Sequence, residues 1–345
     1  MGCMIVPPYL LLRLAQVQDP RLATAAAAAR KSLQHDSPFR STRNGLAPHE
    51  SGEEPESHQP MRTIFDSDHT ETLPGRVVRS EGDPPTNDVT VTEAYDGLGH
   101  THKLFRAEFS RASIDDNNLS LLASVHFGTD YDNAFWDGRR MVFGDGDGQV
   151  FNRFTSSLSV IGHELAHGVM QYTANLVYHG QSGALNESIS DVFGALVEQH
   201  AANQAADAAS WLIGEGLFTD QVQGSALRSM RAPGTAYDDD VLGTDPQPGH
   251  FSDYIETTDD NGGVHLNSGI PNRAFYLVAS ALGGHAWERA GRIWYNTING
   301  GTLSADSDFE RFAEATTATA AEHYGANSKE QSAVAEAWRE VGITQ

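Results

Sequence analysis

Hydrophobic and polar positions follow two different periodicities along most of the chain. From about residue 61 to residue 155, short runs alternate apolar and polar side chains, as in the Val-Thr-Val-Thr stretch at residues 89–92, and turn signals interrupt them. This zone predicts mostly β-strands, with one helix near residues 91–95. From about Ser156 onward, apolar residues recur roughly every 3.6 positions, which predicts helices. They are expected over residues 157–173, 186–202, 272–282, 286–296 and 307–324.

The N-terminal part has its own pattern. Pro7-Pro8 can open a short helix over residues 9–15. Asp19-Pro20 has the form of an N-cap and first turn for an alanine-rich helix over residues 21–33. Residues 34–60 are polar and rich in proline, glycine and serine, which predicts a linker that proteases can reach.

Charge is distributed unevenly over the 345 residues, which are 39% hydrophobic and carry a formal charge of −23. The first 60 residues are neutral in sum, so residues 61–345 hold the whole excess of acid. This charge argues against nucleic acid or an anionic membrane as the main partner, and no apolar run approaches the length of a bilayer span. Basic residues dominate the first 43 positions, so this part either docks on the acidic body or forms a solvated helix.

One cysteine, Cys3, excludes an internal disulfide. The N-terminus is a poor match to a secretory leader, because no basic residue precedes the apolar run at residues 4–12 and two prolines interrupt it. Without a disulfide, packing and bound metal must supply the stability of the fold.

The stretch His163-Glu164-Leu165-Ala166-His167 is typical of a zinc site. Two histidines four residues apart on a helix project from the same face, so both imidazoles can bind one ion. Glu164 lies beside them, where it can take a proton from a zinc-bound water.

A third zinc ligand is expected on a neighbouring element. Glu187 follows His167 by 20 residues and is expected to begin the next helix. Asp191 and Asn186 can accept the distal N–H groups of the ligating histidines. The alternative for Glu187 is an acid that only favours the positive end of a helix.

A further constellation lies at residues 260–269. Hydrolysis of an amide builds an oxyanion that needs a donor besides the metal. His265 held by Asp260 could supply it, because a carboxylate favours the imidazolium. The alternative is an ordinary loop histidine.

Together these motifs, with the stretches at residues 133–136 and 141–146, resemble those of the thermolysin family of zinc endopeptidases, from about Thr63 to the C-terminus. The resemblance implies an α+β, two-domain fold. A β-rich domain over residues 59–178 would end in the helix of the two histidines, and a helical domain would cover residues 179–345. The zinc site would lie in the cleft between them, after a propeptide and linker over residues 1–58.

The same resemblance implies roles for individual residues. His163, His167 and Glu187 would hold zinc, and Glu164 would activate the water and pass its proton to the leaving amine. Tyr178 and His265 would bind the oxyanion, with Asp260 orienting His265. The substrate contacts would come from Asn133, Ala134, Arg228, Val160, Leu227, Phe151 and Phe154. Because the last four are apolar, we expect cleavage before bulky apolar residues. Without the resemblance, Arg228 and Tyr178 would be read as a surface charge and a core aromatic.

Residues 5–11 resemble the short propeptide of the protealysin branch of this family. This implies a self-processing zymogen whose propeptide inhibits its own active site. It also implies a monomer that acts on protein or peptide substrates. The family is secreted, but without a recognisable leader a cytoplasmic precursor or leaderless export also fits. The thiolate of Cys3 could occupy the open zinc position, or it is an unremarkable thiol.

Calcium binding is expected to be weak or absent. Calcium needs six to eight oxygen ligands, several of them carboxylates. At the family's calcium positions only Glu198 and Glu215 supply carboxylates. The other positions hold Ser159, Ser210, Leu212, Phe218 and Ser225.

Two other readings remain. A different zinc hydrolase of the same broad class, such as an aminopeptidase, would need an anchor for the free substrate amine, and none is evident. A silent member that only binds would be expected to have lost the base or a ligand, whereas His163, Glu164, His167, Glu187 and His265 are all present.

Overall fold

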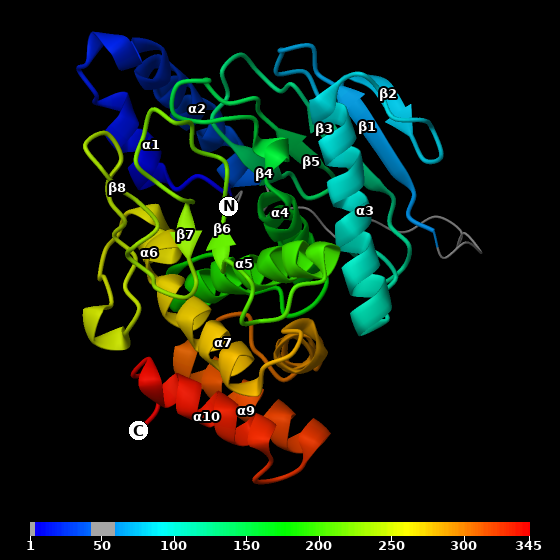
Figure 1. The fold of residues 1–345 in the computed structure, drawn as a ribbon, viewed down its shortest axis with the longest axis vertical. Helices are drawn as coiled ribbons and strands as arrows, with labels where there is room; N and C mark the ends of the chain where they lie inside the picture. Colours follow the sequence, from blue (N-terminus) through cyan, green and yellow to red (C-terminus); the bar gives the residue numbers. More distant parts are fainter. Residues whose placement is uncertain (1–3, 43–58) are drawn as a thin grey trace.

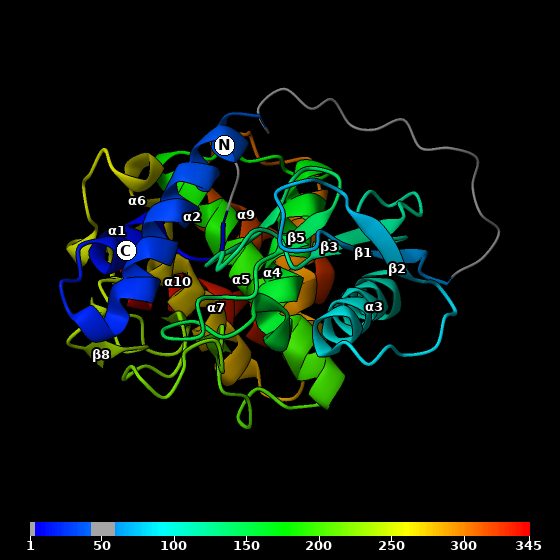
Figure 2. The ribbon, with the colours of Figure 1, turned by 90° about the horizontal axis from the view of Figure 1, so that it is seen from above.

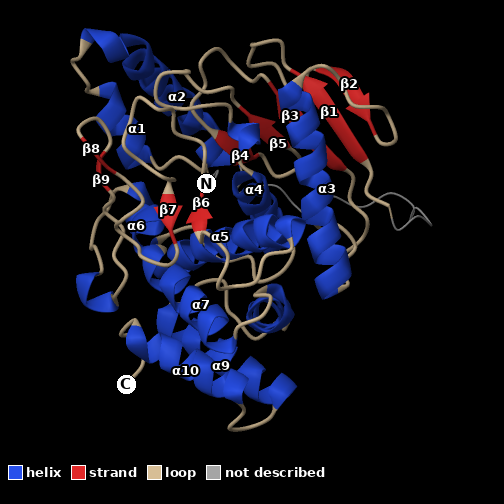
Figure 3. Cartoon of the chain, viewed as in Figure 1, coloured by secondary structure: helices blue, strands red, loops and turns tan. Residues whose placement is uncertain are grey.

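A computed structural model describes residues 4–42 and 59–345, except for the side chains of residues 37–42. The larger strands gather in one half of the molecule and most helices in the other (Figures 1 and 3). The strands are β1 (Arg62–Asp66), β2 (Arg76–Ser80), β3 (Leu121–Val125), β4 (Ala134–Trp136), β5 (Met141–Phe143), β6 (Leu212–Ile213), β7 (Arg228–Ser229), β8 (Asp238–Asp239) and β9 (Gly243–Thr244). The helices are α1 (Pro8–Ala15), α2 (Ala23–Thr42), α3 (Val89–Phe109), α4 (Leu158–Gln171), α5 (Gly180–Ala202), α6 (Asp260–Asn267), α7 (Gly269–Leu282), α8 (Arg292–Asn299), α9 (Phe309–Tyr324) and α10 (Lys329–Glu340). The arrangement confirms the predicted α+β class. Among the described residues, no helix has the length and apolar character needed to cross a membrane.

Five strands form a mixed sheet in the order β2-β1-β3-β5-β4. The strands β1, β3 and β5 run parallel, while β2 and β4 are antiparallel to their neighbours at the two edges. Parallel strands place their carboxyl ends at the same end of a sheet, so the loops that follow β1, β3 and β5 meet there. The edge strand β4 leaves one side available for pairing with another segment.

The helices α4 and α5 pack against each other at the centre of the molecule (Figure 2). Glycines allow their backbones to approach closely, because a Cβ on Gly162 would lie 3.0 Å from the Cα of Gly194. A Cβ on Gly194 would lie 2.4 Å from the carbonyl oxygen of Ser159. This contact places His163 of α4 directly beside α5.

The N-terminal part docks on the body, on the side away from β1 and β2 in both views (Figures 1 and 2). Before α1, Met4 forms an antiparallel bridge with Phe135 of β4, and Ile5 N–H donates to the carbonyl of Ala134 at 3.2 Å. Arg13 of α1 donates to the Val241 carbonyl at 2.9 Å. Of the two expectations for the basic N-terminal part, docking is therefore correct.

Several predicted boundaries were wrong. The helix α2 does not end near residue 33 but continues to Thr42, where a linker was expected. It is held by tertiary contacts: Tyr131 Oη donates to Asp36 at 2.8 Å, and the N–H of Asp132 donates to Ser32 at 2.9 Å. These bonds override the polar composition that predicted a linker.

Two other helices are longer than predicted. The helix α3 runs over Val89–Phe109, whereas the sequence predicted only residues 91–95. Similarly, α5 begins at Gly180, so Glu187 lies inside this helix and does not begin it. The α10 helix was not predicted.

Candidate active site

Two histidines of α4 and one glutamate of α5 converge on a single point. His163 Nε2 and His167 Nε2 lie 3.0 Å apart, and each is 3.5 Å from a carboxylate oxygen of Glu187. All three side chains are fully buried. Ligands that surround a tetrahedral zinc ion at bonds of about 2.0–2.2 Å lie roughly 3.3–3.5 Å from one another. The donor set and its spacing therefore fit zinc.

The far sides of both imidazoles are fixed by hydrogen bonds. His163 Nδ1–H donates to Asp191 at 2.7 Å. His167 Nδ1 lies 2.8 Å from Asn186 Oδ1 and 2.9 Å from the hydroxyl of Ser190. Such bonds hold the tautomer in which Nε2 carries the free lone pair. Ser190 was not anticipated, because a serine inside a helix gives no signal in the sequence.

Asp191 also anchors a buried arginine. Arg228 of β7 donates to both carboxylate oxygens of Asp191 at 2.8 Å, and Asn272 Nδ2 donates to it at 2.8 Å. Burial alone would raise the pKa of Asp191, but Arg228 and His163 reverse this and hold it well below its usual value. Burial likewise opposes the charge of Arg228, yet Asp191 raises its pKa above that of a free guanidinium. Arg228 is therefore a buried, fixed cation.

Glu164 is buried beside the histidine pair. Its Oε2 accepts a hydrogen bond from the backbone N–H of Trp136 at 3.0 Å. The strand β4, which contains Trp136, thereby fixes the carboxylate next to the convergence point.

On the opposite side, a left-handed turn positions His265. Residues 260–263 all have positive φ, from 51° to 84°, which two glycines and an asparagine tolerate well. The turn lets Asp260 accept from both His265 Nδ1 at 2.6 Å and the backbone N–H of His265 at 2.8 Å. Burial lowers the pKa of His265, but Asp260 and Glu187 outweigh it and the net shift is upward.

Tyr178 comes from the loop before α5 and points to the same place. Its hydroxyl donates to Glu187 and lies 3.3 Å from His265 Nε2. The structure thus brings Tyr178, His265 and the three candidate ligands together.

An extended N-terminal segment occupies this cleft. Met4, Ile5 and Val6 are essentially fully buried. His265 Nε2–H donates to the carbonyl of Met4 at 3.1 Å, and Arg228 donates to the carbonyl of Ile5 at 3.1 Å. The resemblance implied that the propeptide would inhibit the active site, but it did not specify which backbone groups would bind.

The same segment contacts the two predicted substrate-binding residues of the edge strand. Val6 N–H donates to Asn133 Oδ1 at 3.0 Å, and Ile5 N–H donates to the Ala134 carbonyl at 3.2 Å. Asn133 Nδ2 also donates to Asp36 of α2 at 3.2 Å. Asn133 and Ala134 therefore bind the backbone of the N-terminal segment in this structure.

The four predicted pocket residues are all buried and, like Ile5, belong to the hydrophobic core that runs through the molecule. They are Val160, Leu227, Phe151 and Phe154. The rings of Phe151 and Phe154 lie 5.7 Å apart.

Two family models together match the chain from residue 54 to residue 343, apart from residues 172–173. The family described as "Thermolysin metallopeptidase, catalytic domain" matches residues 54–171, and "Thermolysin metallopeptidase, alpha-helical domain" matches residues 174–343. The chain belongs to the thermolysin family of metallopeptidases. This confirms the predicted resemblance and, with it, the two-domain thermolysin fold and a metalloendopeptidase. The family is zinc-dependent, in agreement with the three-residue site at His163, His167 and Glu187.

Relatives within the thermolysin family include proteins that match from end to end. An "Extracellular metalloprotease" of Pectobacterium carotovorum subsp. carotovorum is 48% identical over 346 residues, covering 99% of this chain and 96% of that protein. "Protease PrtS" of Photorhabdus sp. (strain Az29) is 51% identical over 284 residues, covering 82% of this chain and 76% of that protein. The solved structure of the precursor of protealysin from Serratia proteamaculans superimposes with a TM-score of 0.89 at 49% identity, covering 99% of this chain and all of that one.

Some predictions fall on residues outside the description or remain open. Cys3 and most of the expected linker lie outside the described residues. At the family's calcium positions, the Ser159 hydroxyl accepts from the backbone N–H of Gly214 at 3.1 Å. Burial raises the pKa of Glu198, and the nearby Glu215 adds to this rise.

Proposed function

We propose that this thermolysin-family metalloendopeptidase is a zymogen in which residues 4–6 block the active site in the manner of a bound peptide. The proposal rests on one observation: this segment makes four of the backbone contacts expected of a substrate. Its carbonyls accept from His265 and Arg228, and its N–H groups donate to Ala134 and Asn133. The match to the protealysin precursor supports the zymogen assignment.

The chemistry follows from what surrounds the blocked position. His163, His167 and Glu187 would hold the zinc ion, which would supply a Lewis acid and lower the pKa of a bound water. Glu164 takes the proton from the attacking water and passes it to the leaving nitrogen. The donors that line the cleft stabilise the developing negative charge on the carbonyl oxygen.

Those donors are His265 and Tyr178. His265 already donates to a peptide carbonyl, that of Met4, in this structure. Asp260 holds its ring and favours its charged form, so we assign Asp260 as the residue that positions His265. Asp191 and Asn186 position the two ligating histidines.

Register in the cleft supports the proposed specificity. The carbonyl bound by His265 belongs to Met4, so Ile5 takes the place of the residue just after the scissile bond. Ile5 is itself a branched apolar residue whose side chain is buried, as are those of Val160, Leu227, Phe151 and Phe154. The mature enzyme should therefore cleave before bulky apolar residues. Arg228 would grip the carbonyl of that residue, as it grips that of Ile5.

We propose residues 1–58 as propeptide and linker, 59–178 as the β-rich domain and 179–345 as the helical domain, with self-cleavage in the linker. The names of the Pectobacterium relative and of the "Extracellular minor metalloprotease" of Serratia marcescens, 41% identical over 293 residues, support action outside the cell. We further propose a monomer that binds calcium weakly or not at all.

Replacing Ile5 tests the latency. Ile5→Glu places a charge in a fully buried site, which favours release of the segment. We expect freshly purified, uncleaved Ile5→Glu precursor to hydrolyse a quenched peptide at least about tenfold faster than the wild-type precursor. Intact mass spectrometry verifies that the chain is uncleaved.

Leu12→Glu is the matched control. The substitution adds the same charge to the N-terminal part, but at a side chain that is 49% exposed. It should stay as silent as wild type. If Ile5→Glu precursor stayed silent while its processed form was active, the blocking role would be wrong. If neither form cleaved peptide, the endopeptidase assignment itself would fail.

A further inference from the structure

A second group of histidine and aspartate side chains lies at the carboxyl end of the sheet. His69 follows β1 by three residues, His126 follows β3 directly, and Asp145 follows β5 by two residues. The three strands are parallel neighbours, so topology alone brings these loops together. None of the three residues has a part in the proposed peptide hydrolysis.

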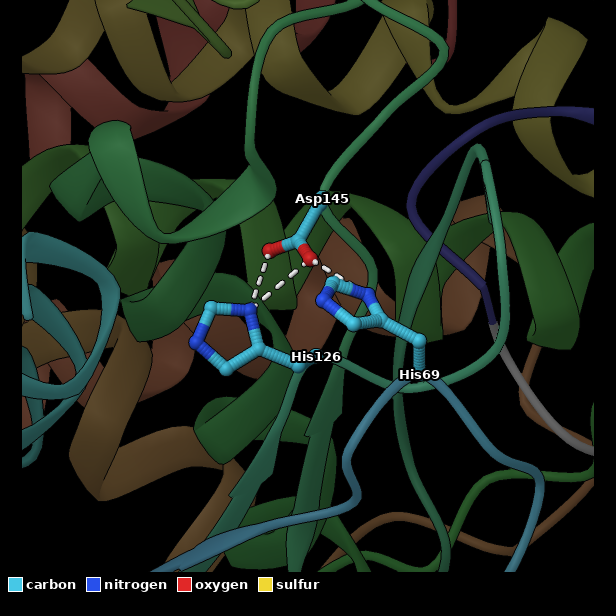
Figure 4. A group of neighbouring side chains, drawn as sticks. All are labelled: His69, His126 and Asp145. Carbon is cyan, nitrogen blue, oxygen red and sulfur yellow. Dashed lines mark hydrogen bonds and ion pairs between the residues drawn. The ribbon is translucent and has the colours of Figure 1, made fainter.

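The three side chains face one another across a small gap (Figure 4). His126 Nδ1 lies 3.0 and 2.8 Å from the two carboxylate oxygens of Asp145. His69 Nδ1 lies 3.5 Å from Asp145 Oδ2. All three ligand atoms are within 4.8 Å of one another. Within residues 4–42 and 59–345, the only other trio of histidine, cysteine, aspartate or glutamate ligands this close is the one in the active site.

The backbone holds both histidines in an uncommon conformation. His69 and His126 have φ of 56° and 53°, the left-handed region that side chains other than glycine seldom adopt. Their loops are joined by the hydrogen bond from the N–H of His69 to the His126 carbonyl, at 2.9 Å. The gap is therefore a fixed feature of the sheet end.

A second carboxylate orients His126. Its Nε2–H donates to Asp88 Oδ2 at 2.9 Å. A histidine whose distal N–H is held by a carboxylate is the usual arrangement at a metal centre, since it directs the other nitrogen toward the ion. Asp88 and Asp145 also give the group two negative charges.

We propose that His69, His126 and Asp145 form a second site for a divalent transition-metal ion of the zinc class. Two imidazoles and one carboxylate suit zinc and its neighbours rather than calcium or magnesium. The 3.5 Å from His69 Nδ1 to Asp145 Oδ2 already matches the ligand separation around a tetrahedral ion. The 2.8 Å from His126 to Asp145 would open by about half an ångström.

The ion would replace the proton that His126 now shares with Asp145. His69 is 59% exposed, so the ion could enter from solvent and keep water as its fourth ligand. It would join the three loops that follow β1, β3 and β5. The N-terminal helix α2 docks on two of these loops, through His35 with Glu71 at 3.0 Å and Lys31 with the Thr129 carbonyl at 3.1 Å.

Zinc stoichiometry of the full-length chain tests the site. Untagged precursor with Glu164→Ala, which blocks self-processing, is equilibrated with ZnCl₂, freed of excess by gel filtration and measured by elemental analysis. We expect two zinc ions per chain, and one when His69→Ala is added. His323→Ala, which removes an exposed histidine elsewhere, should keep two.

A second variant separates a metal site from a structural change. Asp88 is the N-cap of α3, and asparagine caps a helix equally well, so Asp88→Asn should fold normally. It should weaken the second zinc ion about ten- to a hundredfold in a calorimetric titration. One zinc ion per parent chain would overturn the proposal. So would a second ion that His69→Ala and Asp88→Asn both leave unchanged.

Discussion

Two trios of two histidines and one carboxylate differ chiefly in where the protein places them. The trio at His163, His167 and Glu187 is fully buried between two helices, and every imidazole nitrogen has a fixed partner. The trio at His69, His126 and Asp145 lies on loops at the end of a sheet, with His69 largely exposed. Identical donors therefore serve different purposes. The first trio is buried beside Glu164 and the strand β4, as our proposed catalytic role requires, whereas the second trio has neither neighbour.

Removing the base should produce the largest difference between the two trios. With its linker cut by an added protease that is then removed, the Glu164→Ala enzyme should have a kcat/KM for a quenched peptide at least about a thousandfold below that of wild type, because Glu164 is the carboxylate held beside the histidine pair to move the proton. Zinc content should not change. His69→Ala, assayed in parallel, should keep kcat/KM within about twofold.

A Glu164→Ala enzyme that kept a tenth of its activity would assign the base elsewhere. Loss of activity in His69→Ala would join the second trio to catalysis, contrary to the comparison.

Second in size is the effect of the buried ion pair behind the active site. Asp191→Asn leaves Arg228 as an uncompensated buried charge and should lower the free energy of unfolding by about 3–5 kcal/mol. Asp145→Asn, whose partner His126 is partly exposed, should cost about 1 kcal/mol. Urea unfolding at pH 7 measures both. Equal losses of unfolding free energy in the two variants would mean that burial does not distinguish the surroundings of the two trios.

The pH dependence of the sheet-end trio should be smaller. Hydrogen bonds to Asp145 raise the pKa of His126 to about 9 against the opposing effect of burial, and Asp88 adds to the rise. A raised pKa in the folded state stabilises the protein fully below about pH 6.5, and this stabilisation is lost as the pH rises through 9.

In metal-free buffer at pH 6, the free energy of unfolding of wild type should therefore exceed that of His126→Gln by about 1–2 kcal/mol. This difference in stability should be smaller at pH 9.5. Chemical denaturation at the two pH values measures it. A gap that widened toward high pH would contradict the charged pair.

The smallest expected effect concerns calcium. Leu212 supplies no side-chain oxygen and the Ser159 hydroxyl already accepts from the backbone N–H of Gly214, so we expect these two of the family's calcium positions to contribute no ligand. EGTA should move the melting temperature of the zinc-loaded enzyme by less than about 2 °C. A large drop would reveal a calcium site that these residues do not predict.

The candidate active site could be proposed from the sequence because its motifs are local, and the structure brings His163, His167 and Glu187 together. His163, Glu164 and His167 lie within one helical turn and a half, so helical periodicity alone places them together. Glu187 and Asp191 are likewise one turn apart on one helix. Their pairing with α4 required the family resemblance, since nothing in the spacing specifies which helices pack.

Helix lengths were harder to predict, and glycine explains one case. The helix α3 contains Gly97 and Gly99, which normally weaken a helix. Here Gly97 allows close packing, because a Cβ would lie 2.4 Å from the Cδ1 of Ile161 on α4 and that side chain would have to move. Gly97 serves close packing between α3 and α4, and its low helix propensity is why the sequence did not predict the full length of α3.

Long-range partners were beyond the sequence. Nothing near His265 or Arg228 indicates that their acceptors are the carbonyls of Met4 and Ile5, more than 220 positions away. The trio after β1, β3 and β5 was missed for the same reason, since only the parallel order of the strands brings it together.

The antiparallel bridge between Met4 and Phe135 has an evolutionary consequence. The groups that bind the N-terminal segment are those that would bind a substrate. A substitution that reshapes the pocket around Ile5 would therefore also change how strongly this segment inhibits the enzyme. Selectivity and latency therefore cannot drift independently. A lineage whose enzyme comes to cleave at different residues would also need matching substitutions in its N-terminal segment.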